Sequence, residues 1–283
     1  MARPDLSYLK NVFLFLFGLP LGFLTGLSAI SGSVFGVPTV RRLLGLRPAR
    51  AVGVGLTLTF FAALAGILSY TQHGEVRLGL ALLLFAFQTL GALIAERLLL
   101  SRPNLERLPL LWGAVVIAGG LAMLASGFGF LHGPRLPPAI TAHGLEFYAL
   151  AMVLAAGVGL ISRVFGLGGV LIVPAMIYGL GLSPHAAQGT ALVVLAVAGL
   201  PPLLVHVRRG DIEPQSATWL SAGAVFGALT GALVAVTRSD PALVILFGLL
   251  LTVMGLSMLW RRDAAGTYPA GSGGLPEAGS EGE

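Results

Sequence analysis

The sequence predicts an all-α membrane protein built from two inverted-topology repeats, each with a broken or re-entrant helical hairpin and three transmembrane helices. Three observations lead to this fold class. The composition is too apolar for a soluble domain, long apolar runs alternate with basic residues, and the second half of the chain repeats the first. Together they indicate a polytopic protein that crosses the bilayer several times.

The composition excludes a soluble globular domain. Apolar residues make up 56% of the 283 residues, charged residues only 10%, and the mean hydropathy is +0.90. Soluble domains carry about 25% charged residues, so this chain lacks the polar side chains needed to cover a globule of its size. The net charge is +5, but the basic residues stand between apolar runs, where membrane topology explains them, and we expect no nucleic-acid partner. The absence of cysteine excludes disulfides and thiolate metal sites.

Six apolar runs have the length of single transmembrane helices. A helix needs about 20 apolar residues to cross the hydrocarbon core of a bilayer. The predicted spans lie at about 51–72, 78–97 and 108–128 in the first half and at about 186–207, 214–237 and 241–260 in the second.

Two further runs do not fit a single crossing. Residues 11–40 contain no charge and would form a helix of about 45 Å, which is too long for one crossing and too short for two crossings and a turn. Residues 147–184 pose the same problem. Small residues interrupt both runs near the middle, at 31–33 and at 166–169. Broken helices or re-entrant hairpins fit both lengths and both interruptions.

Charge placement favours the hairpin interpretation. If each long run crossed once, the Lys and Arg residues other than Arg163 would be divided 8 to 8 between the two sides. If each run enters and leaves on the same side, 13 lie on one side and 3 on the other. The positive-inside rule makes the richer side cytoplasmic. We therefore expect both termini in the cytoplasm and the chain in the cell (inner) membrane.

The predicted repeats have the same plan. The first covers residues 1–130, with its hairpin at 11–44, and the second covers residues 144–262, with its hairpin at 144–183. A loop at 131–143 connects them. Residues 263–283 are rich in Gly, Ser and Glu and contain almost no apolar residue, which predicts a disordered tail.

An internal duplication underlies this division. Residues 32–56 align without a gap to residues 168–192, and 11 of the 25 pairs are identical. The same offset of 136 residues pairs the turn at 74–76 with the turn at 210–212. Because each half has an odd number of crossings, the second half is expected to lie upside down relative to the first. Inverted repeats with broken helices at mid-membrane are an architecture of secondary transporters, which open a central site to each side in turn.

A Gly-rich constellation distinguishes the second copy of the repeated segment. It consists of Gly166-Leu167-Gly168-Gly169, Pro174, Gly181-Leu182-Ser183, Ala187 and Gly189-Thr190. This pattern resembles the signature of the TauE/SafE sulfite exporter family, also called TSUP or DUF81, over residues of about 20–260. Val170 and Ala191 depart from it, where the family often has Gly and Ser. The resemblance implies transport of small anions or organosulfur compounds such as sulfite, sulfonates or sulfoacetate.

The candidate substrate site lies at the two small-residue interruptions. A helix broken inside the bilayer leaves free backbone N–H groups and a positive helix N-terminus, and an anion satisfies both. Glycines at such positions also serve close helix packing, which is the alternative interpretation. The candidate substrate-binding residues are Ser28, Ser31, Gly32, Ser33, Ser162, Arg163, Gly166, Gly168, Gly169, Gln188, Gly189 and Thr190.

Arg163 is the most informative of these residues. Sixteen uncharged residues precede it and twenty-one follow it. If it lies just before a hairpin tip, its charge is inside the bilayer, where it costs at least about 2.5–3.5 kcal/mol and is functional by default. A shallower hairpin would instead let it snorkel to the interface. Its counterpart in the first half is Leu27, so the site would be asymmetric.

Three other residues each have two possible roles. Thr190 either binds substrate or bonds to a carbonyl of its own helix. His185 and His206 lie at span ends, where an interfacial role is the simpler reading. They are nevertheless the groups available for proton coupling, because no carboxylate lies in the middle of a span.

We interpret the sequence as a secondary transporter that carries a small anion by alternating access. Its expected partners are the anionic substrate and the lipid bilayer, with no cofactor and no metal. Enzyme signatures such as HExxH or a Walker loop are absent from the sequence. The alternatives are a passive anion channel of the same fold and a non-transporting membrane scaffold.

Overall fold

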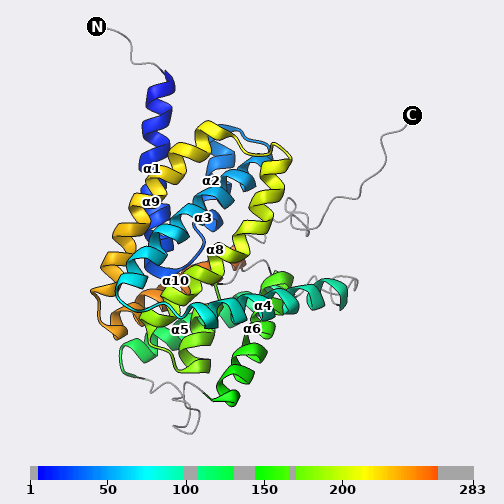
Figure 1. The fold of residues 1–283 in the computed structure, drawn as a ribbon, viewed down its shortest axis with the longest axis vertical. Helices are drawn as coiled ribbons and strands as arrows, with labels where there is room; N and C mark the ends of the chain where they lie inside the picture. The colour runs from blue at the N-terminus through cyan, green and yellow to red at the C-terminus, as the bar shows by residue number, and fades with distance from the viewer. Residues whose placement is uncertain (1–5, 99–107, 131–143, 166–169, 261–283) are drawn as a thin grey trace.

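The computed structural model describes residues 6–98, 108–130, 144–165 and 170–260. Over these ranges the secondary structure is entirely helical (Figure 1). The all-α fold class is therefore confirmed. The predicted connecting loop at 131–143 and the predicted tail at 263–283 lie outside the described residues.

The two halves contribute five helical segments and six helical segments. Those of the first half are α1 (Leu6–Ser28), α2 (Ser33–Leu44), α3 (Pro48–Gln72), α4 (Leu78–Leu98) and α5 (Leu108–Gly127). Those of the second half are α6 (Leu145–Phe165), α7 (Ile172–Pro174), the π-helical turn η2 (Ala175–Gly179), α8 (Pro184–Arg208), α9 (Pro214–Val236) and α10 (Asp240–Trp260).

Local capping signals set several of these bounds. The backbone N–H of Ala186 donates to Ser183 Oγ at 3.2 Å at the start of α8, and Pro184 occupies its first turn. Glu213 caps α9 in the same way, because its carboxylate accepts a hydrogen bond from the Ser216 N–H at 2.9 Å. The caps therefore use side chains that stand immediately before a proline, which cannot itself donate a backbone hydrogen bond.

Six of the described helices are long and apolar enough to cross a membrane. They are the segments Tyr8–Ser28, Pro48–Gln72, Leu78–Arg97, Leu145–Ser162, Pro184–Arg208 and Pro214–Val236. The count equals the predicted one, but two members differ: the first legs of the hairpins, α1 and α6, have the length of full spans. The described apolar parts of α5 and α10, Gly113–Gly127 and Asp240–Leu256, are shorter.

Both long runs are broken, and both fold back. Residues 29–32 separate α1 from α2, and a Cβ added at Gly36 of α2 would lie 3.1 Å from the Leu21 side chain of α1. In the second run, a Cβ added at Gly179 of η2 would lie 2.5 Å from the Leu154 side chain of α6. The return segments are short, with 12 residues in α2, three in α7 and five in η2. Each hairpin therefore pairs a long leg with a short one.

One helix of each half packs against the hairpin of the other half. α1 packs along α9, and its counterpart α6 packs along α4, the counterpart of α9. Glycines make both contacts close. A Cβ at Gly22 of α1 would overlap the backbone of Ala224, and a Cβ at Gly159 of α6 would overlap the backbone of Gln88. The first bundle thus contains α1, α2, α3 and α9, and the second contains α4, α6, α7, η2 and α8.

The central junction joins α3 to α8, which are corresponding helices of the two halves. A Cβ added at Gly53, near the start of α3, would lie 2.5 Å from the Asp211 carbonyl oxygen. At the equivalent position of α8, a Cβ added at Gly189 would lie 2.5 Å from the Glu75 carbonyl oxygen. The start of each helix therefore lies against the turn that follows the other, so α3 and α8 run antiparallel.

The corresponding helices α5 and α10 are antiparallel as well. Gly127 near the end of α5 faces Ile245 in the first half of α10, and Gly255 toward the end of α10 faces Gly113 near the start of α5. Inverted repeats are expected to place corresponding helices in opposite directions in this way. The orientation of each half relative to a membrane stays a prediction.

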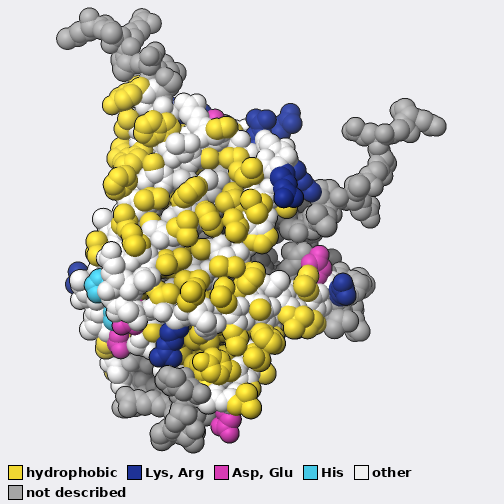
Figure 2. All heavy atoms as spheres, viewed as in Figure 1, with side chains coloured by type: hydrophobic (Ala, Val, Ile, Leu, Met, Phe, Trp, Pro, Cys, Tyr) yellow, Lys and Arg dark blue, Asp and Glu magenta, His cyan; other side chains and the backbone are white. Residues whose placement is uncertain are grey.

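The outer surface is largely apolar. Figure 2 shows hydrophobic side chains over most of one face, with Lys, Arg, Asp and Glu side chains mainly toward its periphery. Large side chains with a high exposed fraction include Val153 at 70%, Phe226 at 57% and Leu249 at 52%. Water would not favour such a surface, but lipid tails would cover it without cost.

Replacing Gly22 by Ala tests the α1–α9 contact. The new methyl group would overlap the Ala224 backbone, and we expect a destabilisation of about 1–3 kcal/mol from overpacking. The matched control is Gly157→Ala in α6, where nothing lies within 4 Å of the added Cβ. The melting temperature of the purified protein should fall in the first variant and not in the second. Equal melting temperatures would contradict the close packing.

Single cysteines in the two equivalent turns test the inversion. His73 and Arg209 are exposed residues at equivalent positions of the two halves, and the natural chain contains no cysteine. We expect an impermeant maleimide applied to intact cells to label His73→Cys and not Arg209→Cys, because an inverted repeat places equivalent turns on opposite sides. Labelling of both variants from the same side would contradict the inverted arrangement.

Candidate functional site

The first break contains a strained residue. Ala29 follows α1 with φ of 54°, and it is the sole non-glycine residue with positive φ in the described ranges. The left-handed conformation costs about 1–2 kcal/mol for a residue with a Cβ. The N–H of Ala29 donates to the Thr25 carbonyl at 2.8 Å, which closes the last turn of α1 before the chain reverses. Sequence reasoning did not single out this residue, because alanine carries no turn signal.

The hydroxyl groups at this break bond to nearby atoms of the protein. Ser28 is fully buried, donates to the Leu24 carbonyl at 2.6 Å and accepts from the Ile30 N–H at 3.4 Å. Ser31 and Thr59 of α3 share a hydrogen bond of 3.0 Å. These bonds hold the break against α1 and α3. In this conformation the hydroxyls of Ser28 and Ser31 therefore have a structural role.

Gly32 and Ser33 form the start of α2. A Cβ added at Gly32 would lie 2.9 Å from both Thr25 Oγ1 and the Leu58 side chain, so the chain reversal requires a small residue there. Gly32 provides no side-chain cap for α2, which begins at Ser33. The side chain of Ser33 lies outside the described residues.

The second break is only partly described. Gly166, Gly168 and Gly169 lie outside the described residues, as does the side chain of Arg163. The backbone places Arg163 in the last turn of α6. The 18 residues from Leu145 to Ser162 cover about 27 Å, close to a full crossing. This length favours an interfacial position for Arg163 over a mid-membrane one, and its role stays a prediction.

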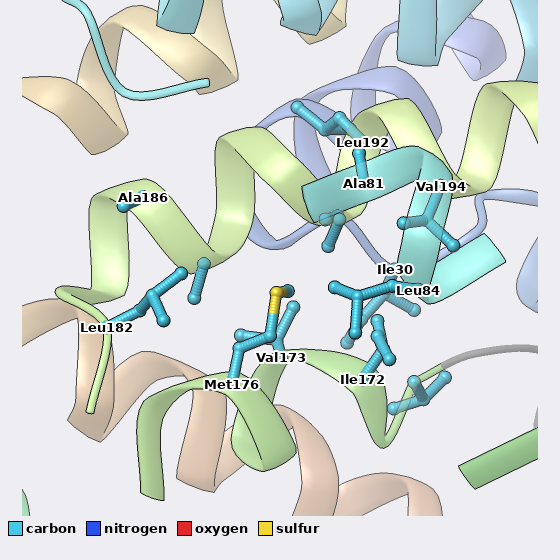
Figure 3. Close-up of a cluster of buried hydrophobic side chains, with 14 of the residues drawn as sticks. Ile30, Ala81, Leu84, Ile172, Val173, Met176, Leu182, Ala186, Leu192 and Val194 are labelled. Carbon is cyan, nitrogen blue, oxygen red and sulfur yellow. The ribbon is translucent and has the colours of Figure 1, made fainter. Parts of the chain in front are cut away.

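The two breaks contribute to a common apolar cluster. Ile30 of the first break and Ile172 of α7 are 3% exposed, and both belong to the larger hydrophobic core. Figure 3 shows the side chains of Ile172, Val173 and Met176 directed toward α4 and α8. The described residues around the two breaks therefore share one apolar cluster, beside the hydroxyl groups of the first break.

The junction of α3 and α8 holds the most deeply buried polar pair. Tyr70 and Gln188 are both fully buried, and the Tyr70 hydroxyl donates to Gln188 Oε1 at 2.7 Å. Gln188 Nε2 has no hydrogen-bond partner among the described residues. A buried amide nitrogen without a partner costs about 1–3 kcal/mol. Gln188 was predicted from its place at the start of a span, whereas Tyr70, at the end of an apolar run, was not.

Gly189 and Thr190 hold the turn between α3 and α4. Gly189 allows the Glu75 carbonyl to approach α8 closely, as described above. Thr190 is buried, and its hydroxyl accepts a hydrogen bond from the Arg77 N–H at 3.2 Å. The substrate contact of Thr190 stays a prediction, and in the structure its hydroxyl accepts this bond from the turn before α4. The bond links the two halves of the chain.

His185 connects the start of α8 to the turn before α10. Its Nδ1 lies 2.9 Å from an Asp240 carboxylate oxygen, and its Nε2 lies 3.2 Å from the Ala235 carbonyl and 3.1 Å from the Arg238 carbonyl. All three partners are oxygen acceptors. Both ring nitrogens of His185 therefore contact oxygen atoms of the segment that joins α9 to α10.

His206, at the end of α8, has a looser environment. Its Nδ1 lies 3.6 Å from an Asp211 carboxylate oxygen. That distance fits an ion pair but is too long for a hydrogen bond. The buried Nδ1 accordingly has no hydrogen-bond partner within the described part of the chain.

Five further buried polar atoms have no partner among the described residues. They are Gln88 Oε1 in α4, Ser162 Oγ in α6, the Tyr178 hydroxyl in η2, and the Oγ atoms of Ser216 and Ser221 in α9. Only Ser162 was predicted. Gln88 is the single amide side chain in the predicted span at 78–97, and that isolation in an apolar run is the signal that would have identified it. In the described residues no group of three or more His, Cys, Asp or Glu could hold a metal ion.

The Tyr70–Gln188 bond is tested by removing one partner and then both. Tyr70→Phe leaves the Gln188 carbonyl oxygen buried and unsatisfied, and we expect a destabilisation of about 1–3 kcal/mol. The double variant Tyr70→Phe, Gln188→Leu removes both polar groups and should recover most of that loss. Unfolding of the purified proteins measures both changes. Additive losses in the double variant would contradict the bond.

The chain is similar to a known protein family along most of its length. The family model described as sulfite exporter TauE/SafE matches residues 2–123 and 148–280. A "Probable membrane transporter protein" of Xylella fastidiosa (strain 9a5c) is 27% identical over 251 residues, which are 87% of this chain and 93% of that protein. No solved structure matches the chain.

A more distant relative supports the same conclusion. The "Probable membrane transporter protein YdhB" of Bacillus subtilis (strain 168) is 22% identical over 250 residues, which are 87% of this chain and 98% of that protein. These matches agree with the six helices that could cross a membrane. The chain therefore belongs to the sulfite exporter TauE/SafE family of multi-pass membrane transporters.

Proposed function

We propose that the protein is a secondary transporter that carries a small anion across the membrane by alternating access, with sulfite, a sulfonate or another organosulfur anion as its substrate. The family description names a sulfite exporter. The names of the relatives specify transport without a substrate. The choice of an anion therefore rests on the chemistry of this chain.

The buried polar groups suit an anion. The observation that carries the proposal is the fully buried Gln188 amide, whose Nε2 carries two N–H donors and has no partner among the described residues. The Tyr70 hydroxyl binds the other end of the amide and thereby fixes its orientation. An oxyanion that reached the α3–α8 junction would satisfy these donors.

Fixed negative charge is kept away from the helix interiors. The carboxylates of the described residues all lie in turns or within three residues of a helix end: Glu75, Glu96, Glu146, Asp211, Glu213 and Asp240. An anion that passed between the helices would therefore meet hydroxyl and amide groups without repulsion from a buried carboxylate. A cation carrier would need the opposite arrangement.

The reciprocal packing of the halves supports alternating access. The contact of Gly53 with the Asp211 turn is repeated by the contact of Gly189 with the Glu75 turn. Two equivalent contacts at opposite ends of α3 and α8 can open one at a time, which exposes a site between them to each side in turn. The basic bias of the loops places both termini in the cytoplasm in this proposal.

A ligand panel tests the proposal. The melting temperature of the purified protein is measured with sulfite, thiosulfate, sulfonates, sulfate, carboxylates and chloride, for wild type, Gln188→Glu and Arg163→Ala. We expect a sulfur oxyanion to stabilise wild type. Gln188→Glu replaces the donor by a carboxylate of the same shape and should weaken binding at least about tenfold, because a hydrogen bond to a charged group contributes about 1.5–3 kcal/mol.

The controls are Gln72→Glu and Arg209→Ala. Both residues are exposed at helix ends, so these variants repeat the chemical changes away from the junction. Loss of binding in Gln188→Glu but not in Gln72→Glu would support the site. Absence of stabilisation by every anion would overturn the proposal and favour a scaffold. Anion conductance without saturation in proteoliposomes would overturn alternating access and favour a channel.

A further inference from the structure

Four exposed arginines lie at the end of the molecule where α8 turns into α9. Arg47 and Arg50 are at the start of α3, and Arg208 and Arg209 are at the end of α8. The start of α3 lies against the α8–α9 turn, because a Cβ added at Gly53 would lie 2.5 Å from a carbonyl oxygen of that turn. Figure 2 shows Lys and Arg side chains gathered at the upper right, where α8 ends in Figure 1. We call these four residues the arginine surface.

The charge of the arginine surface is not neutralised by the carboxylates of the same turn. Those carboxylates have other neighbours: a Glu213 oxygen lies 3.8 Å from Lys10 Nζ, and an Asp211 oxygen lies 3.6 Å from His206 Nδ1. Within the described ranges, none of the four arginines takes part in an ion pair. The surface is therefore available to an anion from outside the chain.

An exposed apolar stripe leads to this surface along α8. Leu200, Leu204 and Val207 are all exposed, and their spacing of four and three residues places them on one helix face. Arg208 follows Leu204 by four residues and continues the same face. A face that is apolar along its length and ends in guanidinium groups fits a phospholipid, which joins acyl chains to a phosphate. A small free anion would contact only the arginines.

The equivalent surface of the other half has a similar stripe without the arginines. The first two leucines of the stripe correspond to Leu64 and Leu68 of α3, which are exposed as well. The equivalents of Arg47, Arg50, Arg208 and Arg209 are Ser183, Ala186, Gln72 and His73. Contact with lipid tails explains both stripes. The positive-inside rule accounts for the side on which the arginines lie, but not for their position around one contact between the halves.

We propose that the arginine surface binds the phosphate headgroup of an anionic phospholipid whose acyl chains lie along the α8 stripe. Guanidinium groups bind phosphate oxygens through paired N–H donors. Arg50 lies one helical turn before Gly53, and Arg209 lies two residues before Asp211. A headgroup held by both arginines bridges the two halves where they meet. The bound lipid therefore stabilises this contact, and it has no counterpart at the contact between Gly189 and the Glu75 turn.

Lipid binding is tested on the full-length protein purified in a neutral detergent. Dioleoyl phosphatidylglycerol, dioleoyl phosphatidylcholine and inorganic phosphate are titrated separately, and the melting temperature is measured at each concentration. We expect phosphatidylglycerol to raise the melting temperature of wild type. Phosphatidylcholine has the same acyl chains but no net charge, and inorganic phosphate has charge but no chains, so each should stabilise the protein much less.

Two double variants remove the charge of the arginine surface. Arg208→Gln with Arg209→Gln should raise the phosphatidylglycerol concentration at half the full shift by at least about tenfold, because basic residues near a membrane surface attract anionic lipid. Arg47→Gln with Arg50→Gln should have the same effect. All four side chains are exposed, so these changes leave the packing of the core intact.

Matched controls are available elsewhere in the chain. Arg77→Gln with Arg238→Gln removes the same charge from exposed positions in other turns and should not change the titration. Leu204→Asn should weaken phosphatidylglycerol binding by disturbing the stripe, whereas Leu68→Asn, at the equivalent position of α3, should not.

Three results would overturn the proposal. They are equal stabilisation by the two lipids, an equal effect of the control variants, and stabilisation by inorganic phosphate as strong as that by phosphatidylglycerol, which would indicate a site for free anions. The proposal does not depend on which anion is transported. Because the substrate panel contains no lipid titration, the two proposals can fail separately.

Discussion

Close contact between helices of opposite halves is the constraint on which the rest of the structure depends. Lipid tails are as apolar as leucine, so membrane helices gain little by hiding apolar surface from them and associate through tight packing instead. Glycines supply that packing where α1 meets α9 and where α6 meets α4. Because α4 packs in the bundle of the second half and α9 in that of the first, the turns that lead into them lie at the α3–α8 junction. The buried Tyr70–Gln188 pair is located there.

The polar groups of this junction hold the two halves together and include one buried donor without a partner among the described residues. Thr190 and Gly189 tie one half to the other through backbone atoms, whereas Gln188, between them and His185 in the chain, keeps part of its amide without a partner in the described structure. A donor without a partner, held by well-anchored neighbours, is the arrangement expected of a preorganised binding group. The hydroxyls at the first break instead form hydrogen bonds with nearby atoms of α1 and α3.

The helical membrane fold was predictable because an apolar composition with runs of span length is compatible with few other folds. The matching glycines of the two halves were predictable because close backbone contact tolerates no larger residue at Gly53 and Gly189. The partners of the site residues were not predictable. Nothing in an apolar run shows that Tyr70 meets Gln188, or that Thr190 receives the Arg77 N–H, because both contacts join residues more than 100 positions apart. The first break, at 29–32, adjoins the small residues at 31–33 that predicted it, whereas the hairpin interpretation gave no reason to expect first legs, α1 and α6, of full-span length.

The packing of helices from one half against the other also determines when each contact can form during synthesis. α1 leaves the ribosome before α9, yet the glycine face that it contacts is on α9, which ends at Val236. Until then, Gly18 and Gly22 of α1 lack the α9 backbone that they contact in the folded protein. A nascent chain stopped after α5 would therefore expose the glycines of α1 that α9 covers in the folded protein.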